Sequence, residues 1–442
     1  MLRYFGTDGV RGEFGKVLTT DMAYRIGRYL GQKRDGVPPR ILLSRDTRIS
    51  GVDLRNALVE GIVKSGGIVY DEGVSTTPSI SYLTIHSHMD YGVMISASHN
   101  PYFDNGIKIF NSHGEKLEEC VEEKIEEYMD REFDDLPEEK GELIDGSSLR
   151  EEYVSWLISK ADPRVSSLRV LVDCANGSAS TIAEEFFSRL GVKATILFAS
   201  PDGRNINRNC GSTHLDELLH GLQEGDFDFG FAFDGDADRF LAFRGDGTPL
   251  DGDRIIYLNA RYKQERGSLT GNKVVITVMS NLGLRRGLEA AGIGYETVQV
   301  GDKYVQACLK EKGYVVGGEQ SGHVIFLDEL NTGDGFLSCV HLMNIAVDEP
   351  SLIEHIEECP VYPQILENVR FESKEEAIEA LSDPKVQKVI AEVDARLGDS
   401  GRVLVRKSGT EPLVRVMSEA SSESDCAEAV RQIIQAIHER NN

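Results

Sequence analysis

The segment FDFGFAFDGDADRF, residues 227–240, joins an alternating run of phenylalanines to a turn that carries three aspartates. Alternation with a period of two is typical of a β-strand with one apolar face. We expect one face of a sheet to carry the side chains of Phe227, Phe229, Phe231 and Phe233. The acidic turn comes directly after this run. The segment therefore predicts a strand that places a polar loop at the edge of a sheet.

The order of elements around this strand occurs three times along the chain. Each copy begins with an apolar, β-rich run: ILLSRDTR from Ile41, VLVDCANG from Val170 and VVITVMSN from Val274. A helical pattern, a glycine break and two further strands follow in each copy. The glycines are Gly67, Gly191 and Gly292. This order predicts three tandem α/β units with mixed, mostly parallel sheets.

A different polar loop follows the third strand of each copy: ISASHNP at 95–101, DGDADR at 234–239 and GGEQSGH at 317–323. Open α/β sheets bind ligands at loops beyond the carboxyl ends of their strands. Three related domains are therefore expected to supply loops to one central cleft.

The remaining segments depart from the repeat. The charged stretch from Leu117 to Asp145 predicts an exposed helix and a linker. The C-terminal part predicts a separate α+β domain, with a helical EEAIEAL region, the strand-loop-strand RVLVRKSGTEPLVRVMSE and an amphipathic helix from Ser424 to Arg440. The expected fold is α/β, with three tandem related domains and a C-terminal α+β domain around a central cleft. The predicted boundaries are 1–150, 151–250, 251–363 and 364–442.

Composition limits the classes of partner. The 442 residues include 48 Lys and Arg against 73 Asp and Glu, a formal net charge of −25 that repels nucleic acid and anionic membranes at long range. Neither is an expected partner, although nearby Arg and Lys can still bind a phosphate, since charges beyond about 8 Å are screened. Seven cysteines without a CxxC pair, and no signal-like N-terminus, predict reduced thiols in the cytoplasm. Whether the chain forms a homodimer stays open.

The DGDADR turn predicts a metal site. Hard divalent cations need several anionic oxygens from one tight loop, and Asp234, Asp236 and Asp238 offer them. An EF-hand is excluded, because Arg239 stands at the sixth position and Gly245 at the twelfth. An acidic surface turn is the alternative, but the preceding apolar strand favours a cation site. The guanidinium of Arg239 could hold a phosphate oxygen beside the metal.

The segment ISASHNPYFDNGIKIF, residues 95–110, predicts a phosphoryl carrier at Ser98. A hydrolase triad with His99 is not favoured, because no G-x-S-x-G elbow surrounds the serine. A structural polar turn is the alternative. A phosphoserine would bring oxygens able to complete the coordination of a metal held by three aspartates. Lys108 could neutralise the phosphoryl group in transit.

Two other loops carry weaker predictions. The RKSGTEPLVR segment contains a glycine turn whose backbone amides, hydroxyls and guanidinium groups could bind a phosphate; an ordinary structural turn is the alternative. The residues concerned are Arg406, Ser408, Gly409, Thr410 and Arg415. The GGEQSGH loop offers Glu319, Ser321 and His323, which are suited to binding sugar hydroxyls. A structural turn is the alternative. Nucleotide binding is not favoured, because the chain has neither a Walker motif nor a G-x-G-x-x-G after a strand.

Together with FGTDGVRG at Phe5 to Gly12, PDGRNIN from Pro201 and CGSTH, these strings make the chain resemble the phosphohexomutase superfamily over its full length. Within it they are most similar to the bacterial branch that acts on glucosamine phosphate. The resemblance implies four domains around a cleft, with one essential loop from each. The chain departs from many members at Lys407, where they have proline, which concerns loop rigidity.

The resemblance also implies roles for residues. Ser98 would be the phosphoserine, and one Mg²⁺ per chain would be held by it together with Asp234, Asp236 and Asp238. The transferring phosphate would be surrounded by Arg11, His99, Lys108 and Arg239. Sugar hydroxyls would be bound by Glu319 and Ser321. The other phosphate would be held by Arg406, Ser408, Gly409, Thr410 and Arg415.

The implied activity is an intramolecular phosphotransfer. The phosphoserine would pass its phosphoryl group to O1 of glucosamine 6-phosphate, and the resulting 1,6-bisphosphate would reorient. The 6-phosphoryl group would return to Ser98 and release glucosamine 1-phosphate, which in this family feeds cell-wall precursor synthesis. A phosphomannomutase or phosphoglucomutase with the same parts is the nearest alternative. A non-catalytic relative that binds sugar phosphates is another.

Overall fold

The computed structural model describes residues 2–6, 8–131, 138–408 and 412–440. Two compact units make up the chain. The first contains Met1–Met279 and Ile293–Ile356, and the second contains Ser280–Gly292 and Glu357–Asn442. None of the helices in the described ranges is long and apolar enough to cross a membrane.

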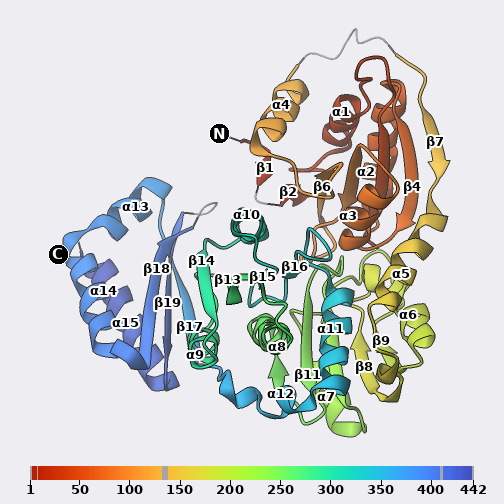
Figure 1. Ribbon diagram of the computed structural model, residues 1–442. Helices are drawn as coiled ribbons and strands as arrows, with labels where there is room; N and C mark the ends of the chain where they lie inside the picture. Colours follow the sequence, from red (N-terminus) through yellow and green to blue (C-terminus); the bar gives the residue numbers. More distant parts are fainter. Residues whose placement is uncertain (1, 7, 132–137, 409–411, 441–442) are drawn as a thin grey trace. The chain divides into compact units, whose positions relative to one another are not determined.

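The first sheet has seven strands in the order β1-β2-β6-β5-β3-β4-β7 (Figure 1). The strands are β1 Phe5–Gly6, β2 Gly9–Glu13, β3 Arg40–Arg45, β4 Ile68–Val74, β5 Tyr91–Ile95, β6 Asp104–Asn111 and β7 Glu142–Asp145. The helices of this part are α1 Thr20–Leu30, α2 Gly51–Lys64, α3 Thr77–His86 and α4 Glu119–Met129. Strand β3 pairs in parallel with β4 and β5, and β6 runs antiparallel beside β5.

The second and third sheets follow along the chain, in the orders β12-β11-β10-β8-β9 and β14-β13-β15-β16. The second part contains α5 Arg150–Ser159, β8 Arg169–Asp173, α6 Ala183–Leu190, β9 Lys193–Leu197, α7 Asp216–Glu224, β10 Phe229–Phe233, β11 Phe240–Arg244 and β12 Pro249–Leu250. The third contains α8 Gly252–Glu265, β13 Lys273–Thr277, β14 Gly294–Val298, α10 Asp302–Lys312, β15 Val316–Gly318, β16 Val324–Phe326, α11 Gly335–Asp348 and α12 Pro350–Glu354.

These three sheets share one topology. In each, the first strand of the repeat lies between the second and the third, in parallel with both, and a fourth strand runs antiparallel beside the third. The three predicted α/β units with mixed sheets are thus confirmed. The repeat pattern did not predict the fourth strands β6, β11 and β16. Each predicted polar loop connects a third strand to its fourth.

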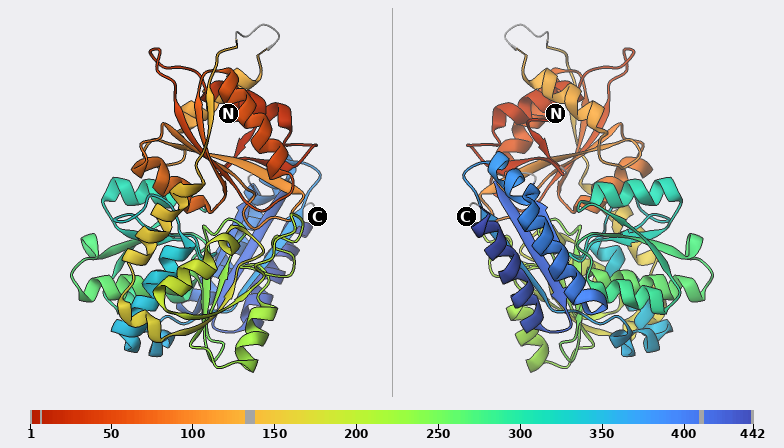
Figure 2. Two further views of the ribbon diagram at one scale, coloured as in Figure 1. Left: turned by 90° about the vertical axis from the view of Figure 1, so that its right-hand side faces the viewer. Right: turned by 90° about the vertical axis from the view of Figure 1, so that its left-hand side faces the viewer.

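The second unit contains an antiparallel sheet in the order β17-β19-β18. Helices α14 and α15 lie along one face of this sheet (Figures 1 and 2). Its elements are α9 Leu282–Ala290, β17 Gln364–Arg370, α13 Lys374–Ser382, α14 Pro384–Leu397, β18 Gly401–Lys407, β19 Leu413–Ala420 and α15 Glu423–Glu439. The predicted C-terminal α+β domain is present, while the four domain boundaries given above stay predictions.

Two local predictions need correction. Phe229, Phe231 and Phe233 are buried, as predicted, but Phe227 precedes β10 and packs in a cluster with Leu171 and Ala232. Ala232 alternates with Phe231 along β10, so Phe227 belongs to the opposite face of the sheet.

The charged helix α4 is not simply exposed. Helix α4 packs on the core of the first sheet through Ile125 and Met129. The carboxylate of Glu126 accepts hydrogen bonds from the backbone N–H groups of Arg3, Tyr4 and Phe5. The stretch after α4, predicted as linker, includes strand β7 at the edge of the first sheet. The acidic composition hid this amphipathic face, because a charge count does not report which side of a helix is apolar.

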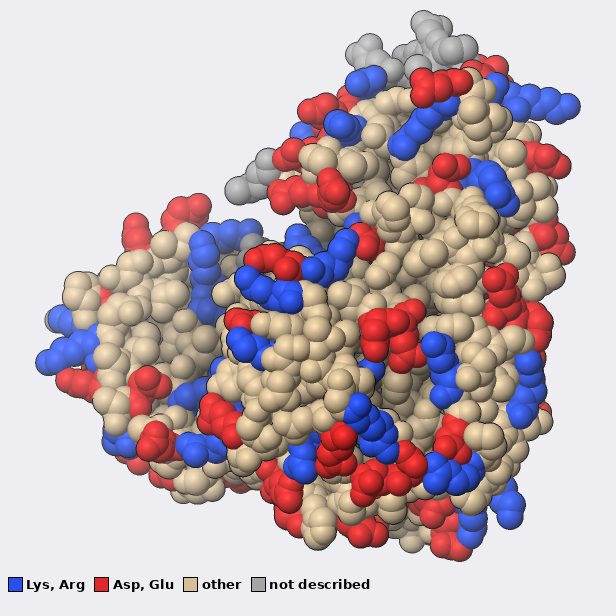
Figure 3. Space-filling model, viewed as in Figure 1, with Lys and Arg blue, Asp and Glu red and all other residues tan. Residues whose placement is uncertain are grey.

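The surface does not gather the acidic side chains into one patch on the face shown in Figure 3. Asp and Glu are scattered there among Lys and Arg. The acidic side chains on this face therefore do not mark a single docking surface.

Glu72 on β4 is a buried carboxyl group in this fold. It is fully buried, with Ser79 Oγ at 3.3 Å and Arg150 Nε at 3.9 Å from its Oε1. Burial raises the pKa of Glu72 to about 7, although hydrogen bonds from nearby serines and the charge of Arg150 oppose the shift. Between pH 4.5 and 7 the folded protein therefore keeps a proton that the unfolded chain releases.

Stability should fall across this pH window, because the folded state binds the additional proton. We predict that Glu72→Gln, which cannot titrate, gains unfolding free energy relative to the wild type between pH 5 and pH 8, by at most about 3 kcal/mol. Denaturant unfolding at the two pH values measures the difference. Glu60→Gln, at an exposed position of α2, is the matched control and should show no such trend. Equal pH slopes for wild type and Glu72→Gln would contradict the prediction.

Candidate active site

Ser98 lies in the loop after β5, in a backbone conformation that non-glycine residues rarely adopt. Its φ is +52°, and only 2% of the residue is exposed. Ser98 Oγ donates a hydrogen bond of 2.5 Å to Asp234 Oδ2 and lies 3.4 Å from His99 Nδ1. The structure thus brings the predicted phosphoryl carrier to the predicted metal loop, which is 136 residues away in the sequence.

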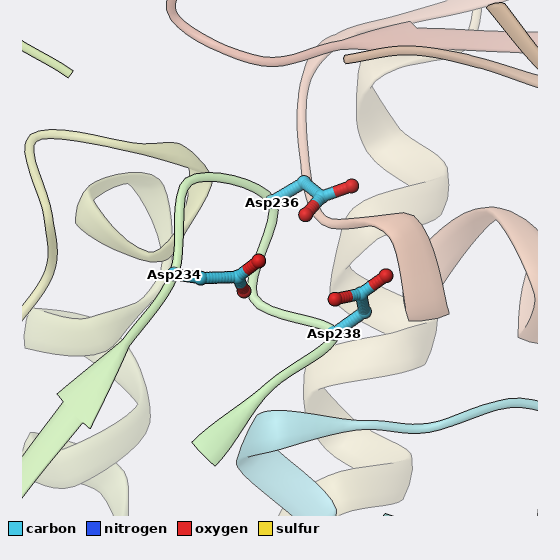
Figure 4. Close-up of side chains that lie close together, drawn as sticks. All are labelled: Asp234, Asp236 and Asp238. Atoms are coloured by element: carbon cyan, nitrogen blue, oxygen red, sulfur yellow. The ribbon is translucent and has the colours of Figure 1, made fainter. Parts of the chain in front are cut away.

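The three aspartates follow β10 on a single loop, with their carboxylates close together (Figure 4). All three are buried, and one oxygen from each lies within 4.8 Å of the others. Asp236 Oδ1 and Asp238 Oδ1 are buried, and neither has a hydrogen-bond partner within the described part of the chain. Unpaired anionic oxygens in such a cluster fit a hard divalent cation, so these residues could hold one.

Lys108 on β6 balances part of this negative charge. Its Nζ is 2.8 Å from Asp236 Oδ2, 3.0 Å from Asp238 Oδ2 and 3.1 Å from Asp8 Oδ2. Burial alone would lower the pKa of Lys108, but these carboxylates hold it well above its usual value. The side chain is therefore a fixed cation at neutral pH.

Burial and neighbouring charges shift the pKa values of Asp234 and His99 in opposite directions. Burial and the charges of Asp238 and Asp236 raise the pKa of Asp234 well above its usual range. Burial, followed by the charges of Arg239 and Arg11, lowers the pKa of His99 to about 4. His99 is therefore neutral at pH 7, and its ring can accept a hydrogen bond.

Arg11 is linked to this region by charged residues that the sequence did not identify: Asp8, Lys116 and Asp302. It pairs with Asp8 at 2.7 Å, and Lys116 pairs with both Asp8 and Asp302. Burial would raise the pKa of Asp8, but Lys108, Lys116 and Arg11 hold it below its usual range. Asp8 lies inside the FGTDGVRG string, which was a usable signal. Asp302 comes after β14, the second strand of its repeat, whereas the loops that the sequence singled out follow third strands.

The GGEQSGH loop connects β15 to β16. Glu319 Oε1 accepts a 2.9 Å hydrogen bond from Gly301 N, and both Glu319 and Ser321 are half-buried. His323 is buried: Gly333 N donates to its Nε2 at 3.1 Å, and its Nδ1 lies 3.7 Å from Asp238 Oδ1. The His323 side chain thus contacts the metal loop, and its role as a sugar ligand stays a prediction.

Arg239 is mostly buried, and its backbone N–H donates to Asp234 Oδ1 at 3.2 Å. Its Nε is buried and has no hydrogen-bond partner among the described residues. An anion beside the acidic loop would satisfy this donor, which fits the predicted contact with a phosphate.

The remaining predicted residues belong to the second unit. Arg406 on β18 lies directly opposite Arg415 on β19, and Arg415 Nε is buried without a hydrogen-bond partner among the described residues. Burial and the charge of Arg415 lower the pKa of Arg406. Ser408 is buried at the end of this hairpin strand. Gly409 and Thr410 lie outside the described residues.

Models of one protein family match successive segments of this chain. Models described as phosphoglucomutase/phosphomannomutase match the chain in order: alpha/beta/alpha domain I at 2–135, domain II at 151–247, domain III at 251–362 and the C-terminal domain at 366–436. The chain belongs to the phosphoglucomutase/phosphomannomutase family. The resemblance seen in the sequence is thus confirmed over the four domains.

Curated relatives cover the full length. Proteins named phosphoglucosamine mutase from Lachnospira eligens and Anoxybacillus flavithermus are 44% and 45% identical to this chain. The alignments cover 99% and 100% of this chain and 98% and 99% of the relatives.

Solved structures share the fold. A phosphoglucomutase/phosphomannomutase family protein from Burkholderia thailandensis has a TM-score of 0.80 at 24% identity, covering 100% of this chain and 98% of that one. Aspergillus fumigatus N-acetylphosphoglucosamine mutase, solved with GlcNAc-6P and magnesium, has a TM-score of 0.72 at 17% identity, covering 100% and 96%.

We predict that divalent cations stabilise the protein and that Asp236→Asn weakens this effect. Removing one of three anionic oxygens lowers cation affinity, and a ligand that binds only the folded state raises its stability. The measurement is the shift in thermal midpoint on adding Mg²⁺ or Mn²⁺ after chelation. Asp226→Asn, at an exposed position paired with Arg169, is the control and should keep the wild-type shift. An equal shift in Asp236→Asn would remove the loop from consideration as a cation site.

Proposed function

We propose that this chain interconverts glucosamine 6-phosphate and glucosamine 1-phosphate through a phosphoserine at Ser98. The observation that carries the proposal is the 2.5 Å hydrogen bond from Ser98 Oγ to Asp234 Oδ2. It places a buried hydroxyl nucleophile against a cluster of carboxylates suited to a divalent cation. Full-length relatives at 43–45% identity carry the name phosphoglucosamine mutase, which supports the same reaction here.

The reaction consists of two phosphoryl transfers. In the first, the bond from phosphorus to Ser98 Oγ breaks as a bond forms to O1 of glucosamine 6-phosphate; the O1 hydroxyl loses its proton and Ser98 Oγ gains one. After the 1,6-bisphosphate turns over, the bond from phosphorus to the sugar O6 breaks and the phosphoryl group returns to Ser98 Oγ, which loses its proton as O6 gains one. In the free enzyme Asp234 Oδ2 accepts the hydrogen bond of the Ser98 hydroxyl, which orients Oγ for this return.

The neighbouring side chains have distinct roles. Lys108 provides a fixed positive charge beside the migrating phosphoryl group, because its pKa is held high. Neutral His99 is placed to hydrogen-bond at Ser98 Oγ. Arg11 and Arg239 supply guanidinium groups for the phosphate oxygens.

We assign Mg²⁺ to Asp234, Asp236 and Asp238, since three carboxylates without nitrogen or sulfur ligands suit a hard cation. When bound, this ion would neutralise charge on the phosphoryl group in transit. Aspergillus fumigatus N-acetylphosphoglucosamine mutase was solved with magnesium, which supports this choice of metal.

A substrate that is phosphorylated at either end needs a second anion site. Arg406 and Arg415 face each other across β18 and β19, an unfavourable arrangement for two cations unless an anion joins them. We therefore propose that they hold the phosphate that is not being transferred, with Ser408, Gly409 and Thr410. Glu319, Ser321 and His323 are proposed for the sugar side of the site.

A parallel assay with glucosamine, glucose and mannose 6-phosphates tests the reaction. We predict that kcat/KM for glucosamine 6-phosphate exceeds the others by at least about tenfold, or about 1.4 kcal/mol of transition-state binding. Intact mass should show one phosphoryl group on the wild type and none on Ser98→Ala, which should not turn over. Preference for glucose or mannose 6-phosphate would favour the phosphoglucomutase or phosphomannomutase alternative. Full turnover by Ser98→Ala would exclude the phosphoserine.

Arg415→Ala should weaken substrate binding more than it reduces phosphorylation of Ser98. A charge-assisted contact to phosphate is worth about 1.5 to 3 kcal/mol, so KM should rise about ten- to a hundredfold. Steady-state kinetics and intact mass separate the two effects. Arg431→Ala, at an exposed position of α15, is the control and should leave KM unchanged. A wild-type KM in Arg415→Ala would return the arginine pair to a structural role.

A further inference from the structure

The backbone of Ser98 is held on its N–H side and on its carbonyl side by hydrogen bonds to side chains. Ser98 N donates to Ser96 Oγ at 2.9 Å, and Ser96 Oγ donates to Asp46 Oδ2 at 2.6 Å. Arg48 Nη2 donates to the carbonyl oxygens of Ser98 at 3.0 Å and Asn100 at 2.6 Å. Both peptide groups of the proposed nucleophile are therefore tied to Asp46 and Arg48.

Asp46 and Arg48 form a buried ion pair. Both side chains have no exposed surface, and Arg48 Nη1 contacts Asp46 Oδ2. Asp46 Oδ1 also accepts a 2.9 Å hydrogen bond from Arg48 N. The two residues follow β3, whereas Ser98 follows β5, its neighbour in the sheet. The pair thus connects adjacent strand ends of the first sheet.

A purely structural role explains this arrangement poorly. Burying an ion pair costs several kcal/mol per charge, and apolar residues of similar size often stabilise a fold as well. The donors of Arg48 are directed at the two carbonyls of the serine turn. That turn includes the Ser98 φ of +52°, a conformation that is strained for a residue other than glycine and persists only where the surroundings fix it.

The geometry points to Arg48 as a positioning residue for the phosphoryl transfer. Anchored by Asp46, its guanidinium holds the Ser98 and Asn100 carbonyls, and Asp46 holds the Ser98 N–H through Ser96. Ser98 Oγ is thereby kept in line with Asp234, both when it gives up the phosphoryl group and when it receives it. This inference rests on the proposed function of Ser98.

Asn207 shows that the turn is held from a second side. Its Nδ2 donates to the same two carbonyls, at 2.9 Å to Ser98 O and 3.0 Å to Asn100 O. Asn207 belongs to the second α/β part, so the turn is fixed between two domains. Arg48 differs from Asn207 in its charge and in its buried anionic partner, and a lysine cannot reproduce its planar fork of donors.

The test is Arg48→Lys, which keeps the charge but loses the fork. We expect kcat to fall about 10- to 100-fold, the effect of a small misplacement of reacting atoms, with KM within about threefold of the wild type. Hydrogen exchange of the peptide that contains Ser98 should be faster in the variant. Arg40→Lys, the same change at the opposite end of β3, is the control and should alter neither quantity.

Each outcome has a defined meaning. A folded Arg48→Lys protein with wild-type kcat, or with a change in KM alone, would overturn the inference. If Arg48→Lys does not fold, Ser96→Ala removes the acceptor of the Ser98 N–H and leaves the ion pair, and its kcat should fall in the same way; an unchanged kcat would overturn the inference. If the wild type turns over no hexose 6-phosphate, the proposed function fails, and hydrogen exchange alone decides whether Arg48 holds the turn.

Discussion

The ion pairs of Lys108 with Asp236 and Asp238 join two domains at the point where the chemistry is placed. Lys108 comes from the last strand of the first repeat, and the aspartates come from the loop of the second. Burying several carboxylates close together would cost several kcal/mol for each charge without compensation. The ammonium offsets part of this cost, and Thr77 N fixes the same loop by a 2.9 Å hydrogen bond to Asp236 O. The relative position of the Ser98 turn and the acidic loop therefore depends on this charge balance.

Some of the residues with left-handed backbone lie in these loops and in the loops that contact them. Non-glycine residues with positive φ include Ser98 and Ala237, in the loops after β5 and β10, and Asn176 and Asn207, in loops of the second part that contact the first. Each such residue costs of order 1 kcal/mol or more and needs outside contacts to persist. Thr47 Oγ1 donates to Asn176 O at 2.7 Å, so contacts between the first two domains supply some of this support. The interface and the strained loops thus stabilise one another.

The sequence could predict what local patterns encode. Apolar runs followed by helical periods identified the three repeats, and polar strings after their third strands identified Ser98 and the aspartates. The IKIF segment of β6 was expected to be strand-like, but β11, β16 and the antiparallel pairing of all three were missed, because this pairing depends on partners that only the fold brings alongside. Arg48 was missed for the same reason: its two carbonyl partners lie 50 and 52 residues away. Phe227 continued a clean alternation, yet β10 begins at Phe229, so Phe227 lies outside the strand and packs with the cluster on the other face.

Both candidate ligand sites keep like charges close together in the free protein. Three carboxylates share the loop after β10, and Arg406 faces Arg415 in the second unit. Like charges placed directly opposite one another are destabilising, so a cation at the first site and a phosphate at the second would each relieve repulsion. Part of the binding free energy then comes from the removal of strain already present. Because these groups are partly or fully buried, salt screens this contribution less than it screens surface charge. A protein with a net negative charge can therefore bind a phosphorylated sugar, because the nearby charges in the site act strongly while salt screens the distant acidic groups on the surface.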